Sequence, residues 1–100
     1  MNTLTPFNMT ELLHNDHYKI ATIELAAGTN MPRHFSDCEG FLIVEKGSAL
    51  LIYPGQTFEL SSGSNLSIPP NEHHLIKVIE DFKAYLVLGN KSSVTFPNLS

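Results

Sequence analysis

The stretch "GTNMPRHFSDCEGFLIVEKG", residues 28–47, decides how the rest of this chain is interpreted. It begins and ends with glycine, and it places His34, Ser36, Cys38 and acidic side chains directly before the apolar run "FLIV". Histidine, cysteine and carboxylate are the side chains that bind transition metals in proteins. The stretch therefore raises the question of whether it is a metal site, half of one, or a pocket without metal chemistry.

Short apolar runs separated by turn residues surround this stretch and predict β-strands at 18–25, 41–47, 48–55, 57–63, 65–70, 74–80 and 84–89. Their close, regular spacing is typical of an all-β barrel or sandwich. The polar segment 80–83 is expected to divide the last two strands. A single helical turn at 10–13, with Thr10 as N-cap, is the only helix expected. In the polar tail 91–100, residues 94–96 are expected to pair at a sheet edge.

Length, charge and cysteine content limit the classes of protein to consider. The chain has 100 residues and a net charge of −4, so we expect one domain with a barrel at 18–90 and peripheral segments at 1–17 and 91–100. The few basic residues are scattered, which argues against a nucleic-acid partner. The apolar runs are too short to cross a membrane. The lone Cys38 and the absence of a signal-peptide pattern predict a cytoplasmic protein.

One predicted strand is apolar on both of its faces. In "SALLIY", Ala49, Leu51 and Tyr53 alternate with Leu50 and Ile52, whereas a small barrel has only one interior. The second apolar face predicts a homodimer that forms through a sheet face. The alternative is that the N-terminal segment covers this face with its own apolar side chains, Leu4, Phe7 and Met9.

Two spaced patterns carry a family resemblance. In the first, Gly28, His34 and Gly47 match the pattern Gly, five residues, His, one residue, His, three or four residues, Glu, six residues, Gly. In the second, Gly63, Pro69 and His74 match Gly, five residues, Pro, one residue, Gly, two residues, His, with Asn71 at the second glycine position. With these motifs the chain resembles the cupin family, specifically the small single-domain cupins.

The resemblance implies a cupin jelly roll, also called a double-stranded β-helix, which is a barrel of antiparallel strands with a pocket inside. In that family the pocket often holds a divalent metal through His, His, Glu and His. Here His34 and His74 match the first and last ligands, whereas Ser36 stands at the second histidine position and Gly40 at the glutamate position. Only half of the family's metal ligands are therefore present.

Neighbouring residues offer two ways to complete a metal site. The carboxylate of Glu39 could join His34 and His74 as a two-histidine, one-carboxylate set, which suits iron or manganese. The thiolate of Cys38 would favour zinc instead. Alternation along a strand would turn Glu39 away from the face of Gly40, although a loop relaxes that rule. A divalent metal (Zn, Mn, Fe or Ni) is thus a possible cofactor, and no cofactor is certain.

Three functions are compatible with these residues. The first is a small-molecule-binding cupin with its pocket around His34 and His74, to which Ser36, Leu42 and Tyr53 also contribute. The second is a metal-dependent enzyme, a dioxygenase or isomerase, which uses both histidines with Glu39 or water. The third is a structural protein whose pocket is vestigial. Six apolar side chains are candidates for lining the pocket: Leu42, Val44, Leu51, Ile68, Ile76 and Leu86.

The remaining candidate side chains have simple structural interpretations. His73 should face away from His74 by alternation, and His14 and His17 should lie in an exposed turn. Cys38 is expected to be a small, at least partly buried side chain. The Pro69-Pro70 pair predicts a rigid turn that presents His74.

Overall fold

The computed structural model describes residues 8–97, and this part of the chain consists of β-strands and turns. Its eight strands are β1 (Asn8–His14), β2 (Tyr18–Leu25), β3 (Asn30–Ser36), β4 (Gly40–Tyr53), β5 (Gln56–Ser61), β6 (Asn65–Ile68), β7 (His74–Gly89) and β8 (Val94–Thr95). All pairings between them are antiparallel. Among residues 8–97 no helix is long and apolar enough to cross a membrane.

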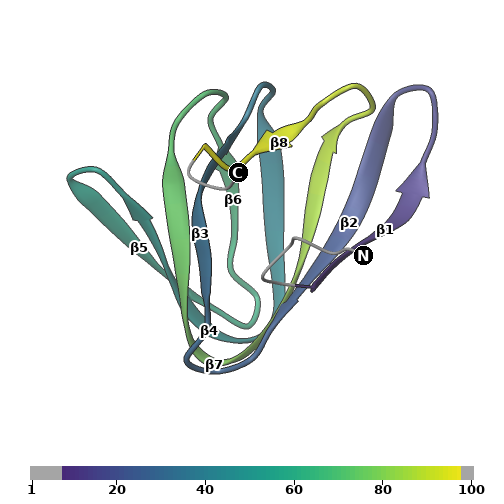
Figure 1. Cartoon of the computed structure of the whole chain (residues 1–100). Helices are drawn as coiled ribbons and strands as arrows, with labels where there is room; N and C mark the ends of the chain where they lie inside the picture. Colours follow the sequence, from purple (N-terminus) through teal and green to yellow (C-terminus); the bar gives the residue numbers. More distant parts are fainter. Residues whose placement is uncertain (1–7, 98–100) are drawn as a thin grey trace.

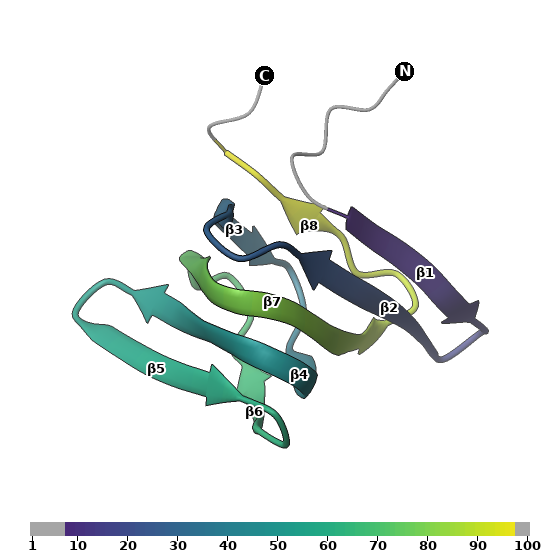
Figure 2. The ribbon, with the colours of Figure 1, turned by 90° about the horizontal axis from the view of Figure 1, so that it is seen from below.

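The two longest strands, β4 and β7, pair with each other and pass through both layers of the barrel. One layer has the order β1-β2-β7-β4-β6, and the other has the order β8-β3-β7-β4-β5. The layers meet at the bottom of Figure 1 and diverge toward the top. Seen from below, β4 and β7 lie in the middle of the molecule (Figure 2). This arrangement confirms the expected cupin double-stranded β-helix.

The bend between the layers lies where Gly47 of β4 crosses Asp81 of β7. Gly47 has a φ of 89°, and a Cβ at this position would overlap the carbonyl carbon and oxygen of Asp81. Only glycine combines this left-handed backbone with so close an approach. The pairing register shifts at the bend, between Val44 and Ala49. The polar segment 80–83 therefore marks a bend in one continuous strand and does not divide two strands, and the runs 41–47 and 48–55 likewise form one strand.

Two local expectations from the sequence are wrong. The helical turn expected at 10–13 belongs to β1, which pairs with β2 and contains a register shift between Glu11 and Leu13. Pairing with a neighbouring strand outweighs the weak preference of so short a segment for a helix. Residues 30–36, for which no strand was expected, form β3. Pro32 is tolerated there because it lies within an irregularity of the pairing with β7, between Met31 and His34.

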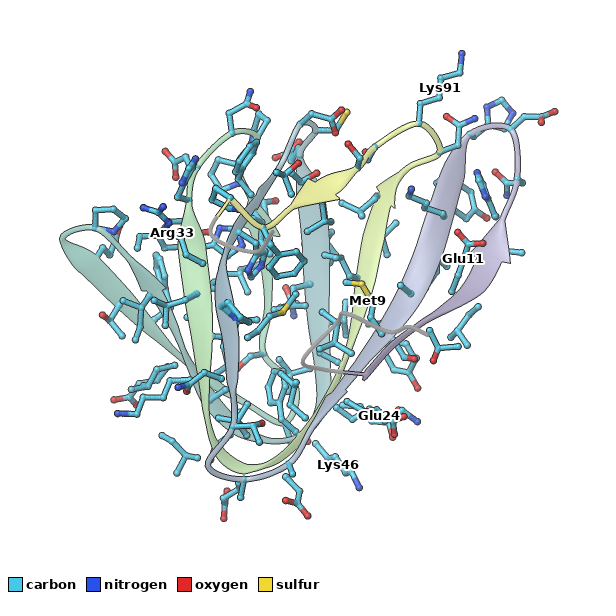
Figure 3. The ribbon with its side chains drawn as sticks, viewed as in Figure 1. Met9, Glu11, Glu24, Arg33, Lys46 and Lys91 are labelled. Carbon is cyan, nitrogen blue, oxygen red and sulfur yellow. The ribbon has the colours of Figure 1, made fainter. Side chains whose placement is uncertain are left out.

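The core fills the space between the two layers with aliphatic side chains and Phe82. Met9 points inward from β1 and packs against this core, whereas Glu24 and Lys46 project from the closed end (Figure 3). Leu4 and Phe7 lie outside the described residues. Leu50 and Ile52 are half-buried on the outer face of their layer. Phe41 and Ile43, on the outer face of the other layer, are each 39% exposed.

Candidate functional site

A pair of buried histidines lies at the open end of the barrel. His34 on β3 and His74 on β7 are register partners on adjacent strands, and their ring centroids lie 4.3 Å apart at an interplanar angle of 69°. Their exposed fractions are only 6% and 3%. Strand pairing thus brings together two residues that are far apart in the sequence and that the two motifs had singled out.

The turn before His74 is tied to the strand that carries His34. Asn71 is the one residue other than glycine in the described part of the chain with a positive φ, 64°, and it occupies the motif's second glycine position. Asparagine is among the residues that tolerate this conformation best. The N–H of Asn71 donates to the carbonyl of Ser36 at 2.7 Å. This bond links the two motifs and supports the predicted role of Pro69-Pro70 in presenting His74.

Both imidazole rings are oriented by backbone carbonyls. Nδ1 of His34 lies 2.7 Å from the carbonyl oxygen of Pro32, and Nδ1 of His74 lies 2.8 Å from that of Glu72. Because a carbonyl only accepts hydrogen bonds, each Nδ1 carries the proton. Each Nε2 of a neutral ring therefore has a free lone pair, and neither has a hydrogen-bond partner among residues 8–97. The pair presents two acceptors to whatever lies beside it.

Burial keeps this pair neutral. It lowers the pKa of His34 to about 4, while the bond to Pro32 opposes the shift and the neighbouring His74 adds to it. Burial also lowers the pKa of His74, against the opposing effects of the bond to Glu72 and the charge of that residue. At neutral pH both rings are uncharged, so the site accepts hydrogen bonds and does not attract anions.

The cavity beside the histidines is small and mostly apolar. Its volume is about 20 Å³, which is enough for about one water molecule or one comparably small group. It is lined by Ile23, Met31, His34, Ser36, Gly40, Leu42, Ile68, His74, Ile76, Leu86, Leu88 and Val94. Of the apolar side chains expected there, Leu42, Ile68, Ile76 and Leu86 line it, whereas Val44 and Leu51 belong to the core beyond it.

Aliphatic side chains fill the space beside the position at which the cupin motif has its glutamate. A Cβ on Gly40 would lie 2.9 Å from Cδ2 of Leu88 and 3.3 Å from Cδ1 of Leu86. A longer side chain at position 40 would therefore require both leucines to move. The family's carboxylate is replaced here by hydrocarbon.

The structure does not bring Glu39 or Cys38 into the site. Both are exposed, and Glu39 lines a shallow groove on the outside of the barrel with Tyr18 and Phe41. Within the described part of the chain, no three His, Cys, Asp or Glu side chains gather closely enough to hold a metal ion. Two imidazoles beside apolar side chains lack the three or four donors that a transition metal requires. The residues present therefore do not fit the metal centre that the cupin motif implies.

Two aromatic side chains contact the pair. Tyr53 lies outside the inner cavity, with its ring centroid 5.2 Å from that of His74. Phe96, which follows β8, lies 5.2 Å from the ring of His34. The sequence analysis did not indicate this contact. The usable signal was that Phe96 lies two residues after Val94, so both side chains are expected to point to the same side of an extended segment, and Val94 lines the cavity. Burial raises the pKa of Tyr53, and the negative charge of Glu72 adds to the shift.

The other histidines and the cysteine lie away from the cavity. His73 is half-buried and stacks on Phe35 with 4.5 Å between ring centroids. His14 and His17 are exposed, as expected for a surface turn. Cys38 is an exposed free thiol, so the expectation of a buried side chain is wrong, because its segment lies in the turn after β3.

Solved structures with the same fold include enzymes and proteins that are described only as cupins. The polyketide cyclase RemF from Streptomyces resistomycificus is 24% identical, with a TM-score of 0.79, over 94% of this chain and 72% of that one. An RmlC-like cupin family protein from Methanocaldococcus jannaschii is 25% identical, with a TM-score of 0.74, over 89% and 84%. The DMSP lyase DddQ from Ruegeria pomeroyi is 16% identical, with a TM-score of 0.84, over 94% and 53%.

The sequence itself gives one family match and no match to a curated protein. The model of the AraC-like ligand binding domain matches residues 18–94, which include both histidines and every strand from β2 to the start of β8. Together with the structural neighbours, this match confirms the resemblance to small cupins. The chain belongs to the AraC-like ligand binding domain family and has the cupin fold.

Proposed function

We propose that this protein binds a small molecule whose hydrogen-bond donor group is held by His34 and His74. The observation that carries the proposal is the orientation of the pair: both Nδ1 atoms are occupied by backbone carbonyls, so both Nε2 atoms accept. A cavity of about 20 Å³ beside them suits one hydroxyl or amino group of a ligand, or one water molecule. The ligand-binding description of the family supports small-molecule binding, without naming residues.

The metal-dependent enzyme has less support. This hypothesis needs Glu39 or water as a third ligand, but Glu39 is exposed on the outside of the barrel. At the motif's glutamate position, the side chains of Leu86 and Leu88 lie against Gly40. Enzymes occur among the solved structures with this fold, but a shared fold does not transfer a reaction. We therefore favour binding over catalysis for the histidine pair.

Histidine-selective NMR on protein purified without added metal tests the proposal. We expect both His34 and His74 to carry their proton on Nδ1, and we expect short-chain alcohols or amines to shift the Nε2 resonances of these two residues. His17→Gln serves as control because His17 is exposed, and it should leave the shifts unchanged. Near-stoichiometric zinc, iron, manganese or nickel that disappears in the His34→Ala, His74→Ala double variant would establish the metal alternative instead.

We also propose a homodimer, formed through a sheet face as expected but not through the face of Leu50 and Ile52, which are half-buried on the other layer. The proposed interface is the outer face of the layer β1-β2-β7-β4-β6. Large apolar side chains on this face include Tyr18, Phe41 and Ile43, each 39% exposed. Contiguous apolar surface of this kind is typical of sheet faces that pair with another molecule. The exposed free thiol of Cys38 supports a reducing compartment such as the cytoplasm.

A further inference from the structure

A second hollow lies outside the histidine cavity, between two unpaired strand edges. Among the strands of residues 8–97, β5 and β6 each pair only with β4, one in each layer, so a gap separates their other edges. A groove of about 450 Å³ occupies this position, which is within the range of small-molecule sites. It is lined by Tyr53, Pro54, Gln56, Phe58, Leu66, Ser67, Pro69, Glu72 and His73. None of these residues lines the inner cavity.

Two aromatic rings form one wall of the groove. Tyr53 is the register partner of Gln56, and Leu51 is that of Phe58, so Tyr53 and Phe58 share the inward-facing side of the β4–β5 hairpin. Their ring centroids lie 5.9 Å apart at an interplanar angle of 85°. Phe58 is still 37% exposed. An edge-to-face pair with exposed ring surface offers a flat apolar contact to a ligand ring.

The groove lining contains one carboxylate side chain. Glu72 lines the groove, whereas its lining contains neither lysine nor arginine. No salt bridge to the Glu72 carboxylate is formed by a residue within 8–97. The effect of Glu72 on the pKa of Tyr53 indicates that the carboxylate lies near the aromatic wall. A negative charge beside aromatic ring faces attracts an organic cation in two ways, through the carboxylate and through the rings.

We propose that this groove is a second binding site, which takes an arylalkylamine with its ring against Tyr53 and Phe58 and its ammonium group at Glu72. The site is separate from the inner cavity because the Tyr53 ring, which packs against His74, lies between them. The proposal does not depend on what the histidine pair binds. It predicts a preference among ligands of one shape that differ only in charge.

Three probes with a phenyl ring on a short chain test this preference: 2-phenylethylamine, 2-phenylethanol and 3-phenylpropionate. Each is titrated into ¹⁵N-labelled full-length protein and followed by amide shifts. We expect saturable shifts around Tyr53, Phe58 and Glu72, with the amine binding about fivefold more tightly than the alcohol and the carboxylate binding most weakly. Equal or tighter binding of 3-phenylpropionate, shifts centred elsewhere, or no saturable shift with any probe would overturn the proposal.

Matched variants locate the charge. Glu72→Gln should bring the dissociation constants for amine and alcohol within about twofold of each other, since it removes only the carboxylate charge. Glu59→Gln makes the same change on β5, but Glu59 pairs with Leu50 on the outer face and does not line the groove, so the preference should persist. Phe58→Ala should weaken both probes. An equal loss of preference in Glu59→Gln would show a general charge effect and reject the assignment to Glu72.

Discussion

Leu88 lies where a side chain at position 40 would have to go. A Cβ on Gly40 would lie 2.9 Å from Cδ2 of Leu88, and both residues line the cavity beside the histidines. Glycine on one strand and leucine on the next are therefore complementary in volume. Apolar packing therefore occupies the space beside the position at which the motif has its glutamate.

This complementarity predicts non-additive effects on stability. Gly40→Ala should lower the free energy of unfolding by about 1 kcal/mol, because the methyl group crowds a flexible leucine tip. Leu88→Ala should lower it by about 2 to 4 kcal/mol by leaving a cavity. In the double variant, the new methyl group occupies part of the space that the leucine vacated, so the loss should be smaller than the sum. Urea unfolding of all four proteins measures this, and strict additivity would contradict the packing described here.

The bend between the layers should depend on Gly47 more than on any turn glycine. Gly47→Ala combines a left-handed backbone with overlap of the Asp81 carbonyl, so we expect it to cost more than about 3 kcal/mol or to prevent folding. Gly55→Ala is the matched control, since Gly55 has a φ of 80° with no atom within 4 Å of the added Cβ. It should cost only about 1 kcal/mol. Similar losses for both variants in urea unfolding would disprove the close approach.

Stability should fall in mild acid because of the buried pair. The pKa of His34 is about 4 in the folded protein, against an ordinary value of 6.5. Between these values the unfolded chain binds a proton that the folded chain does not, so stability is complete above about pH 6.5 and decreases as the pH falls toward 4. We expect a loss of about 1 kcal/mol per pH unit from this residue. Urea unfolding of wild type and His34→Gln at several pH values should show this slope reduced in the variant and unchanged in His17→Gln.

The proposed dimer face can be tested with two isoleucines on opposite layers. Ile43→Lys places a charge on the outer face of the layer β1-β2-β7-β4-β6, and we expect it to shift the protein from dimer to monomer. Ile79→Lys makes the same change on the outer face of the other layer, where Ile79 is 54% exposed, and should leave the dimer intact. Light scattering coupled to size-exclusion chromatography measures both. A monomeric wild type, or dissociation by Ile79→Lys alone, would reject this face.

The spacing of glycines and histidines predicted the fold and pointed to the histidine pair because each motif lies within a short segment and has fixed distances between its residues. His34 and His74 each lie at a fixed distance from a turn, so antiparallel pairing brings them together. Asn71 could be placed at a glycine position because it is one of the residues that tolerates a left-handed backbone.

The features that the sequence did not predict depend on packing between distant segments. The cavity is nearly filled because Leu86 and Leu88 of β7 reach the space beside Gly40, some 45 residues earlier in the sequence. The contact of Phe96 with His34 requires that β8 pair with β3. The groove forms because β5 and β6 do not pair with each other. The alternation of apolar and polar residues along one strand does not show which neighbouring strands it pairs with.

The passage of β4 and β7 through both layers has a consequence for how the molecule opens. Neither layer can separate from the other as an independent unit, because each contains half of the same two strands. Amide protons in the middle of β4 and β7 should exchange only through global unfolding, whereas those of β1, β5, β6 and β8 can exchange by local fraying at the margins. The two binding regions therefore adjoin different kinds of strand. His74 begins one of the two central strands, which hold both layers together, whereas the groove lies between two marginal strands that can open locally.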